Sequence, residues 1–288
     1  MTDGTAQPEE RGAVSPINNL VVVSDLHIGC QLGLLNPEGA LLDNGGHYAP
    51  SEFQKRVWLW WREFWDVFVP DATKGEPFCV VVNGDALDGP GVRGATHQWS
   101  HNLTDQGRAA LHILRPLVDR CNGMFYFVRG TEAHGGKSEQ DSERLAAELG
   151  SIPNKTGLFA RYDLWKMVGP SLVHLTHHVA ATGSMQFEST AVHRELVDTF
   201  TEAGRWGQRP PDVVVRSHRH RHVETVIPIA NGRAFATTTP GWQGKTPFVW
   251  RGSGRLSEPQ FGGLVIRHAH GETFVRPWVQ SLERGKPE

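Results

Sequence analysis

Carboxylate and imidazole side chains follow several short apolar runs in this sequence of 288 residues. Eight of them stand close to the end of such a run: Asp25, His27, Asp85, Glu132, His134, His177, His218 and His220. Mixed carboxylate and imidazole ligands suit Mn²⁺, Zn²⁺ or iron better than Mg²⁺ or Ca²⁺. Eight groups exceed the needs of one ion and fit two ions that share a carboxylate. Two ions roughly 3.5–4 Å apart can hold a bridging hydroxide and stabilise an in-line displacement at phosphorus.

Each of these motifs is weak when taken alone. An Asp-x-His sequence after a strand, here Asp25 to His27, is more often structural than a ligand pair. A Gly-Asp-x-x-Asp sequence also occurs in ordinary turns, where Asp bonds its own backbone. The run from His218 to His222 could be a solvated basic loop. The prediction of a metal site depends on the coincidence of these motifs, and we place Asp85 at its centre.

Five apolar runs predict the strands that would position these side chains. They span residues 20–24, 78–82, 124–128, 172–176 and 213–215. A continuous β-branched run, such as the first of these, is typical of a strand buried on both faces. The carboxyl ends of strands in an open α/β sheet form the edge where ligands and catalytic groups gather. Folding one sheet would therefore bring the candidate ligands together.

Helical spacing and capping residues predict the elements between the strands. Helices are expected over residues 52–69, 104–120, 138–150 and 185–203. Short strands near 223–229, 233–239, 262–267 and 273–279 are separated by turn residues, which indicates antiparallel pairing. We expect residues 1–16 to form a disordered arm and residues 17–288 to form a single domain.

The predicted helix at 52–69 is unusually aromatic. Its apolar positions fall at helical spacing and include Trp60, Trp61, Phe64 and Trp65. We interpret this face as packing on the sheet; a surface for stacking bases, or for a partner protein, is the alternative.

Composition narrows the class of protein. Hydrophobic residues at 39% and charged residues at 21% are ordinary for a soluble enzyme. A net charge of -2 provides no global basic field for nucleic acid. The three cysteines share no close spacing, which excludes a disulfide framework and favours a reducing compartment. No apolar run approaches the length of a membrane span, so we expect a cytoplasmic protein without membrane contact.

The order of the motifs resembles that of the calcineurin-like metallophosphoesterase superfamily. The blocks are Asp25-x-His27, Gly84-Asp85-x-x-Asp88, Gly130 to His134, His177 and Ser217-His218-x-His220. The resemblance implies an α/β fold, a four-layer α/β/β/α sandwich with two mixed sheets flanked by helices. It implies two divalent metal ions, with manganese expected first and zinc, iron or nickel as alternatives.

The resemblance also implies a role for each block. Asp25, His27 and His220 would hold the first metal, Asp85 would bridge, and His177 and His218 would hold the second. His134 would be the catalytic histidine. Asp88 would orient either a ligand or that histidine.

The sequence departs from the family pattern in its third block. Gly130-Thr131-Glu132-Ala133-His134 stands where the family has Gly-Asn-His, so the asparagine that ligates the second metal is missing. We prefer Glu132 as the replacement, with the Thr131 hydroxyl as the alternative. Ser217 replaces a glycine, which is a mild change. His177 comes first after its strand, so we prefer it to His178 as the ligand.

Substrate class follows from the same motifs. Gly89 stands where Ser/Thr protein phosphatases of the superfamily carry an arginine, which disfavours that activity. We expect a phosphodiesterase acting on a phosphoester, either nucleic acid or a nucleotide-like diester, with Arg129 and Arg219 as candidates for binding phosphate. A phosphomonoesterase with the same centre, or a scaffold that has lost activity, is the alternative.

Overall fold

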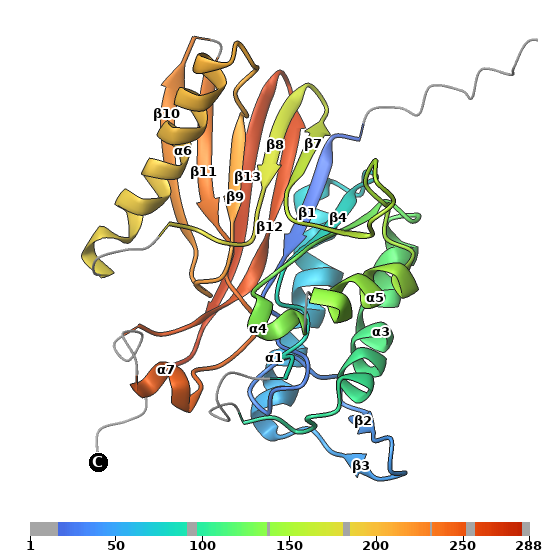
Figure 1. Ribbon diagram of the computed structural model, residues 1–288. Helices are drawn as coiled ribbons and strands as arrows, with labels where there is room; N and C mark the ends of the chain where they lie inside the picture. The colour runs from blue at the N-terminus through green and yellow to red at the C-terminus, as the bar shows by residue number, and fades with distance from the viewer. Residues whose placement is uncertain are drawn as a thin grey trace, which may run out of the picture.

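The computed structural model describes residues 17–90, 97–136, 139–180, 185–230, 232–251 and 257–283 (Figure 1). The arm expected at residues 1–16 lies outside this part of the chain, as does Ser138, the expected start of a helix. None of the described helices is long and apolar enough to cross a membrane.

The first sheet carries the three parallel strands that the apolar runs predict. Its order is β13-β12-β1-β4-β5-β6, with β1, β4, β5 and β6 parallel, β12 antiparallel to β1, and β13 antiparallel to β12. The strands are β1 (Asn19–Val23), β4 (Cys79–Asn83), β5 (Phe125–Val128), β6 (Ala160–Arg161), β12 (Gln260–Ala269) and β13 (Glu272–Ser281).

The second sheet is also mixed, and its order is β10-β11-β9-β8-β7. Strands β8, β9 and β11 are parallel, and the edge strands β7 and β10 are antiparallel to their neighbours. The strands are β7 (Leu164–Val168), β8 (Ser171–Leu175), β9 (Val213–Arg216), β10 (Val223–Ile229) and β11 (Gly232–Thr238). A separate small hairpin joins β2 (Ala40–Leu41) to β3 (His47–Tyr48).

Helices lie outside both sheets (Figure 1). They are α1 (Glu52–Glu63), α2 (Val69–Thr73), α3 (Leu103–Arg120), α4 (Glu132–Gly135), α5 (Gln140–Leu149), α6 (Glu188–Arg205) and α7 (Pro247–Arg251). The expected helix at 52–69 is interrupted by a π-helical turn, Phe64–Phe68, before α2. A 3₁₀ turn, Met185–Phe187, precedes α6.

Alternate residues of the strands enter different cores, and this defines the layers. In β1, Val21 and Val23 pack with the helices α1, α3 and α5, whereas Leu20 and Val22 pack against the second sheet. Val214 of β9 packs instead against α6. Because side chains alternate across a strand, three separate cores require four layers. The predicted four-layer α/β/β/α sandwich is confirmed.

The aromatic helix at 52–69 packs on the first sheet, as we expected from the spacing of its apolar residues. Trp61 and Trp65 are both 2% exposed, and the ring of Trp61 lies 4.8 Å from that of Trp242. Trp60 lies 5.1 Å from Phe261 on β12. These rings form the core between helix and sheet, so they are not a surface for stacking bases.

Some elements carried no recognised pattern in the sequence. Strands β6 and β7 fall in a stretch, residues 151–170, for which we predicted nothing. The hairpin of β2 and β3 lies within residues 30–50, where we predicted neither a strand nor a helix. Each of β2, β3 and β6 has two residues, which is too short for a periodic signal.

Candidate metal centre

The backbone at several candidate ligands has a positive φ angle, which residues other than glycine rarely adopt. Five of the nine described non-glycine residues with positive φ are predicted ligands: Asp25, His27, Asp85, His218 and His220. Such strain persists where the surrounding structure fixes it, and it gathers at functional sites. The loops after β1 and β4 fix each other, because Asp25 N donates to Gly84 O (3.0 Å) and His27 N to Asp85 O (3.1 Å).

The first group of ligand atoms comes from Asp25, His27 and His220. The two Nε2 atoms of His27 and His220 lie 3.2 Å apart, and His220 Nε2 lies 3.3 Å from Asp25 Oδ1. The other carboxylate oxygen, Asp25 Oδ2, accepts from Ser24 Oγ (2.6 Å) and from His218 N (3.2 Å). Asp25 therefore turns one oxygen to the protein and one to the two imidazoles.

The second group comes from Asp25, Asp85, His177 and His218. His177 Nε2 lies 3.0 Å from Asp85 Oδ2, and His218 Nδ1 lies 4.0 Å from the same oxygen. His177 Nδ1 is 2.7 Å from the carbonyl of Asn83, which can only accept, so Nδ1 carries the proton and Nε2 is left as a ligand atom.

Gly84 makes the close approach of the second group sterically feasible. Its φ is +88°, and a Cβ atom at this position would lie 2.2 Å from Nδ1 of His177. Any side chain here would push His177 away from Asp85. This explains in physical terms why glycine precedes the central aspartate.

Besides His27 Nδ1, which lies 3.3 Å from Asp88 Oδ1, two buried ligand atoms of the cluster have no hydrogen-bond partner: Asp25 Oδ1 and His177 Nε2. Leaving a buried polar atom unpaired costs free energy, so such atoms in an otherwise well-paired site indicate a missing ligand. Both face the centre of the cluster, which is made of carboxylates and imidazoles. These residues therefore fit divalent metal ions of the Mn²⁺, Zn²⁺ and Fe class.

Electrostatics keep the carboxylates ionised despite their burial. Burial alone would raise the pKa of Asp25, but His220 and His177 outweigh it and hold that pKa well below its usual range. The pKa of Asp85 is likewise lowered, because His177 outweighs burial. Burial would lower the pKa of His177, yet the two aspartates raise it to about 9. Two ionised carboxylates therefore face the imidazoles, and a bound cation would be neutralised by these same carboxylates.

His134 lies beside this cluster. Its ring is 4.6 Å from that of His27, edge to face, and a ligand atom of His134 falls in a third group with His27 and Asp85. Its Nδ1 lies 2.7 Å from the carbonyl oxygen of Asp88. That carbonyl fixes Nδ1 as the protonated nitrogen and leaves Nε2 for chemistry.

The sequence left open whether Asp88 orients a metal ligand or the catalytic histidine. In the structure Asp88 orients both His27 and His134, through different atoms. Its backbone carbonyl contacts His134, and its carboxylate Oδ1 lies 3.3 Å from Nδ1 of His27. Asp88 is fully buried. A carboxylate behind a ligating imidazole fixes the ring and increases the basicity of its other nitrogen.

Thr131, rather than Glu132, is positioned at the cluster, and this corrects our preference. Thr131 donates to Asp85 through its amide (2.6 Å) and its hydroxyl (3.0 Å), and its Oγ1 is 3.3 Å from Nδ1 of His218. Glu132 is exposed in the first turn of α4 and belongs to none of the described groups of ligand atoms. Thr131 directly follows Gly130, so it occupies the position of the family asparagine.

Of the two arginines expected to bind phosphate, Arg129 is committed elsewhere, whereas Arg219 has a buried Nη1 without a hydrogen-bond partner. Arg129 is 9% exposed, and its guanidinium contacts Glu139 (3.1 Å), Glu143 (3.3 Å) and the carbonyl of Ala160 (3.0 Å). Arg219 donates to the carbonyl of Ala180.

Two further histidines lie outside the groups of ligand atoms. His178 is exposed, whereas its neighbour His177 is buried in the cluster. His222 lies 3.0 Å from the carbonyl of Thr238 through its Nδ1 and belongs to none of the described groups. The ring of His178 lies 5.3 Å from that of His218, but of His177, His178 and His222 only His177 belongs to a described group of ligand atoms.

Hydroxyl groups beneath the ligands were missed in the sequence. Ser217 Oγ accepts from Asn83 Nδ2 and from Thr239 Oγ1, each at 2.7 Å, and Thr239 Oγ1 is 2.6 Å from Ser24 Oγ. Ser217 stands in place of the family glycine, so this departure was the one available signal. The hydrogen bonds of Ser217 and Thr239 join the ends of β1, β4, β9 and β11 beneath the candidate ligands.

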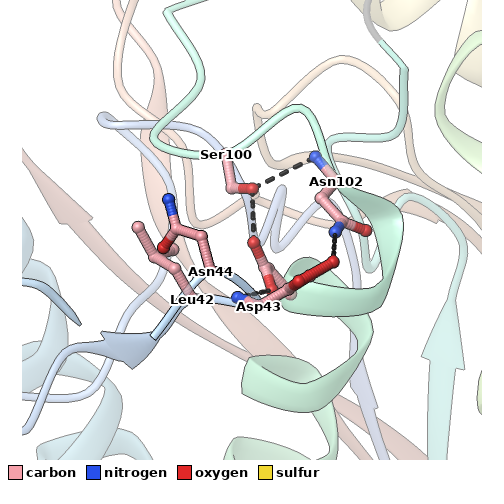
Figure 2. A pocket seen from close by; sticks show the side chains of 6 residues that line it. Leu42, Asp43, Asn44, Ser100 and Asn102 are labelled. Carbon is pink, nitrogen blue, oxygen red and sulfur yellow. Dashed lines mark hydrogen bonds between the residues drawn. The ribbon is translucent and has the colours of Figure 1, made fainter. Parts of the chain in front are cut away.

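A separate cavity of about 260 Å³ lies between the loop at Leu42–Asn44 and the start of α3 (Figure 2). Its polar atoms are paired with one another: Asp105 accepts from Asp43 N (2.9 Å) and Ser100 Oγ (2.8 Å), and Asn102 donates to Asp43 (2.6 Å). None of its residues belongs to the described groups of ligand atoms. We assign the chemistry to the Asp/His cluster.

Two mixed sheets lie between helices, and residues of the five motif blocks meet around a largely buried Asp/His cluster. This is the arrangement that the resemblance to the calcineurin-like metallophosphoesterase superfamily led us to expect. No protein-family model and no curated protein matches the sequence.

Solved structures similar to this chain have low identity. A solution NMR structure of a Thermotoga maritima protein shares 12% identity, with 92% of this chain and 100% of that chain covered and a TM-score of 0.35. Vacuolar protein sorting 29 from Cryptosporidium parvum shares 13%, with 93% and 100% covered and a TM-score of 0.33. Thermus thermophilus sulfate thiohydrolase SoxB in complex with glycerol shares 12%, with 93% and 57% covered and a TM-score of 0.37. At these TM-scores the neighbours add nothing to what the fold and the cluster show.

Proposed function

We propose that this protein is a metal-dependent phosphoester hydrolase, and specifically a phosphodiesterase with two divalent ions. The observation that carries the proposal is the pair of ligand groups sharing the buried Asp25, with unpaired Asp25 Oδ1 and His177 Nε2 facing their centre. A group of this composition is expensive to bury without cations.

The residues would divide between two ions as follows. Asp25, His27 and His220 would hold the first, His177, His218 and Thr131 the second, and Asp85 would contribute to both. The ions would supply an activated water and charge stabilisation at phosphorus. We propose manganese as the first ion to test.

His134 would act as the general acid. With Nδ1 donating to the carbonyl of Asp88, a protonated His134 presents Nε2–H beside His27 and Asp85. A proton delivered from this nitrogen to the departing ester oxygen makes that oxygen a better leaving group.

The charge of the surroundings favours a diester over a monoester. A monoester carries a second negative charge that needs further cationic donors, and Arg129 is already bound to Glu139 and Glu143. Gly89 stands where protein phosphatases of the superfamily have an arginine. A diester, which carries one charge and is found in nucleotides and nucleic acids, makes the smaller demand.

The test begins with protein purified without a histidine tag. Metal per chain is counted by elemental analysis, and hydrolysis of bis-p-nitrophenyl phosphate is compared with that of p-nitrophenyl phosphate in added Mn²⁺. We expect two ions per chain and faster turnover of the diester. A preference for the monoester would overturn the diesterase assignment, and a protein that binds no metal and hydrolyses neither compound would overturn the proposal as a whole and leave a scaffold.

A further inference from the structure

Asp88 is held by two buried amides that belong to no motif of the family pattern. Its Oδ2 accepts from Gln98 Nε2 (2.9 Å), and its Oδ1 accepts from Gln243 Nε2 (3.2 Å). Gln98 is 9% exposed and Gln243 is 6% exposed. The same carboxylate faces Nδ1 of His27, so each oxygen of Asp88 has a fixed direction.

The amide of Gln98 has only one arrangement that satisfies its neighbours. Its Nε2 donates both to Asp88 Oδ2 and to the carbonyl of Gly89 (2.7 Å), neither of which can donate. Its Oε1 lies 2.6 Å from Nδ1 of His101. With both hydrogens and the oxygen engaged, the side chain cannot turn without leaving a buried group unpaired.

Gln106 fixes the backbone next to Asp88. Its Oε1 accepts from Gly89 N (2.9 Å), and its Nε2 donates to the carbonyls of Gly89 (3.1 Å) and Ser100 (2.9 Å). A Cβ atom on Gly89 would lie 2.5 Å from Cα of His134, so this glycine packs directly on the backbone of the proposed acid. The glutamines therefore stand behind both His27 and His134.

We infer that Gln98 is a positioning residue for the first metal position, acting through Asp88 on His27. A neutral amide directs the carboxylate without neutralising it, so Asp88 keeps its full charge for the Nδ1–H of His27. A negative carboxylate 3.3 Å from Nδ1 favours the His27 tautomer that is protonated at Nδ1, which leaves Nε2, 3.2 Å from Nε2 of His220, as the ligand atom. The inference rests on the proposed function, because it assigns a role around the same ions.

The test measures Mn²⁺ affinity directly, without an activity assay. A His218→Ala background removes a ligand of the second position, so that the remaining site reports the first. Free Mn²⁺ is followed by electron paramagnetic resonance in this background with and without Gln98→Leu. We expect binding to weaken by roughly 10–100-fold, the usual effect of losing a partner behind a metal ligand.

A matched control separates positioning from general destabilisation. Ser151 is fully buried and follows the end of α5. Its hydroxyl donates to the carbonyls of Phe125, which begins β5, and Phe159, and neither residue is a candidate ligand. Ser151→Ala should lower the melting temperature but leave Mn²⁺ affinity unchanged. Equal losses of affinity in both variants would overturn the inference.

A double-mutant cycle tests whether Gln98 acts through Asp88. Asp88→Asn removes the carboxylate that Gln98 directs, so adding Gln98→Leu to it should change the Mn²⁺ affinity by less than about threefold. Additive losses would overturn the route through Asp88. If the parent protein binds two ions and Gln98→Leu binds as tightly as its background, only this inference fails. If the parent protein binds none, the proposed function fails first.

Discussion

The two halves of the candidate metal centre differ in how firmly they are supported. In the first half, the side chains of His27 and Asp88 are 3% and 0% exposed, and a buried glutamine stands behind them. In the second half, the side chain of His218 is 45% exposed, and Thr131 replaces the amide of the family pattern. The most exposed ligand of the first half, His220, has 18% of its side chain exposed, so the second half opens to solvent further than the first, through His218.

This difference in support should give the two positions different affinities for metal. A ligand set fixed by buried partners loses little freedom when an ion binds, so affinity at the first position should be high. A partly exposed imidazole and a hydroxyl provide a weaker and more adaptable set. We expect the first position to be occupied permanently and the second to fill according to metal supply.

The largest effect should come from the residue that we propose contributes to both ions. Asp85→Ala removes that carboxylate and leaves two cations to repel each other, so both ions and all activity above background should be lost. Elemental analysis and the diester assay measure this. Asp212→Ala provides the control, because Asp212 accepts from Leu172 N at the opposite end of the second sheet. Retention of metal by the Asp85 variant would contradict the architecture of the centre.

His134→Ala should separate chemistry from metal binding. Because Nδ1 of His134 bonds the carbonyl of Asp88 and the ring only borders the ligands, both ions should remain. Turnover of the diester should fall roughly 10²–10⁴-fold, the usual contribution of a general acid. Turnover like that of the parent protein would remove His134 from the mechanism.

Graded removal of metal tests the comparison itself. Dialysis against increasing chelator should release one ion well before the other, with apparent affinities about 10–100-fold apart. The ion retained longest should depend on His27, and the ion lost first on His218. Variants His27→Ala and His218→Ala, each analysed for residual metal, identify which ion leaves. Simultaneous release of both ions would show that the two positions are equally supported.

The smallest effect concerns the altered third block. Thr131→Asn restores an amide oxygen next to Asp85 and His218, and we expect the second ion to bind up to about tenfold more tightly, or roughly 1.4 kcal/mol. Glu132→Gln is the matched control and should change nothing, since Glu132 is exposed. A loss of the second ion in the Glu132 variant would restore that residue as the ligand.

Much of this molecule follows from the sequence. Buried parallel strands are continuous apolar runs, so β1, β4 and β5 and the sharp turn at Gly84-Asp85 could be predicted within about a residue. Because the parallel strands of one sheet end at one edge, Asp25 and Asp85 were expected to meet. The expectation of one sheet was wrong for His177, which follows β8 of the second sheet. The helix at 52–69 revealed its buried face by its spacing, although its π-helical turn did not show.

Tertiary structure decided matters that depend on the direction of single side chains. Thr131 and Glu132 are neighbours in sequence, and only the start of α4 turns one to Asp85 and the other to solvent. Arg129 follows a strand that leads to the site, but its guanidinium is drawn to Glu139 and Glu143. Gln98 reaches Asp88 from a segment with no motif. Strand periodicity fixes which end of a sheet a residue reaches, whereas loop dihedrals and competition among buried hydrogen-bond partners fix what it touches there.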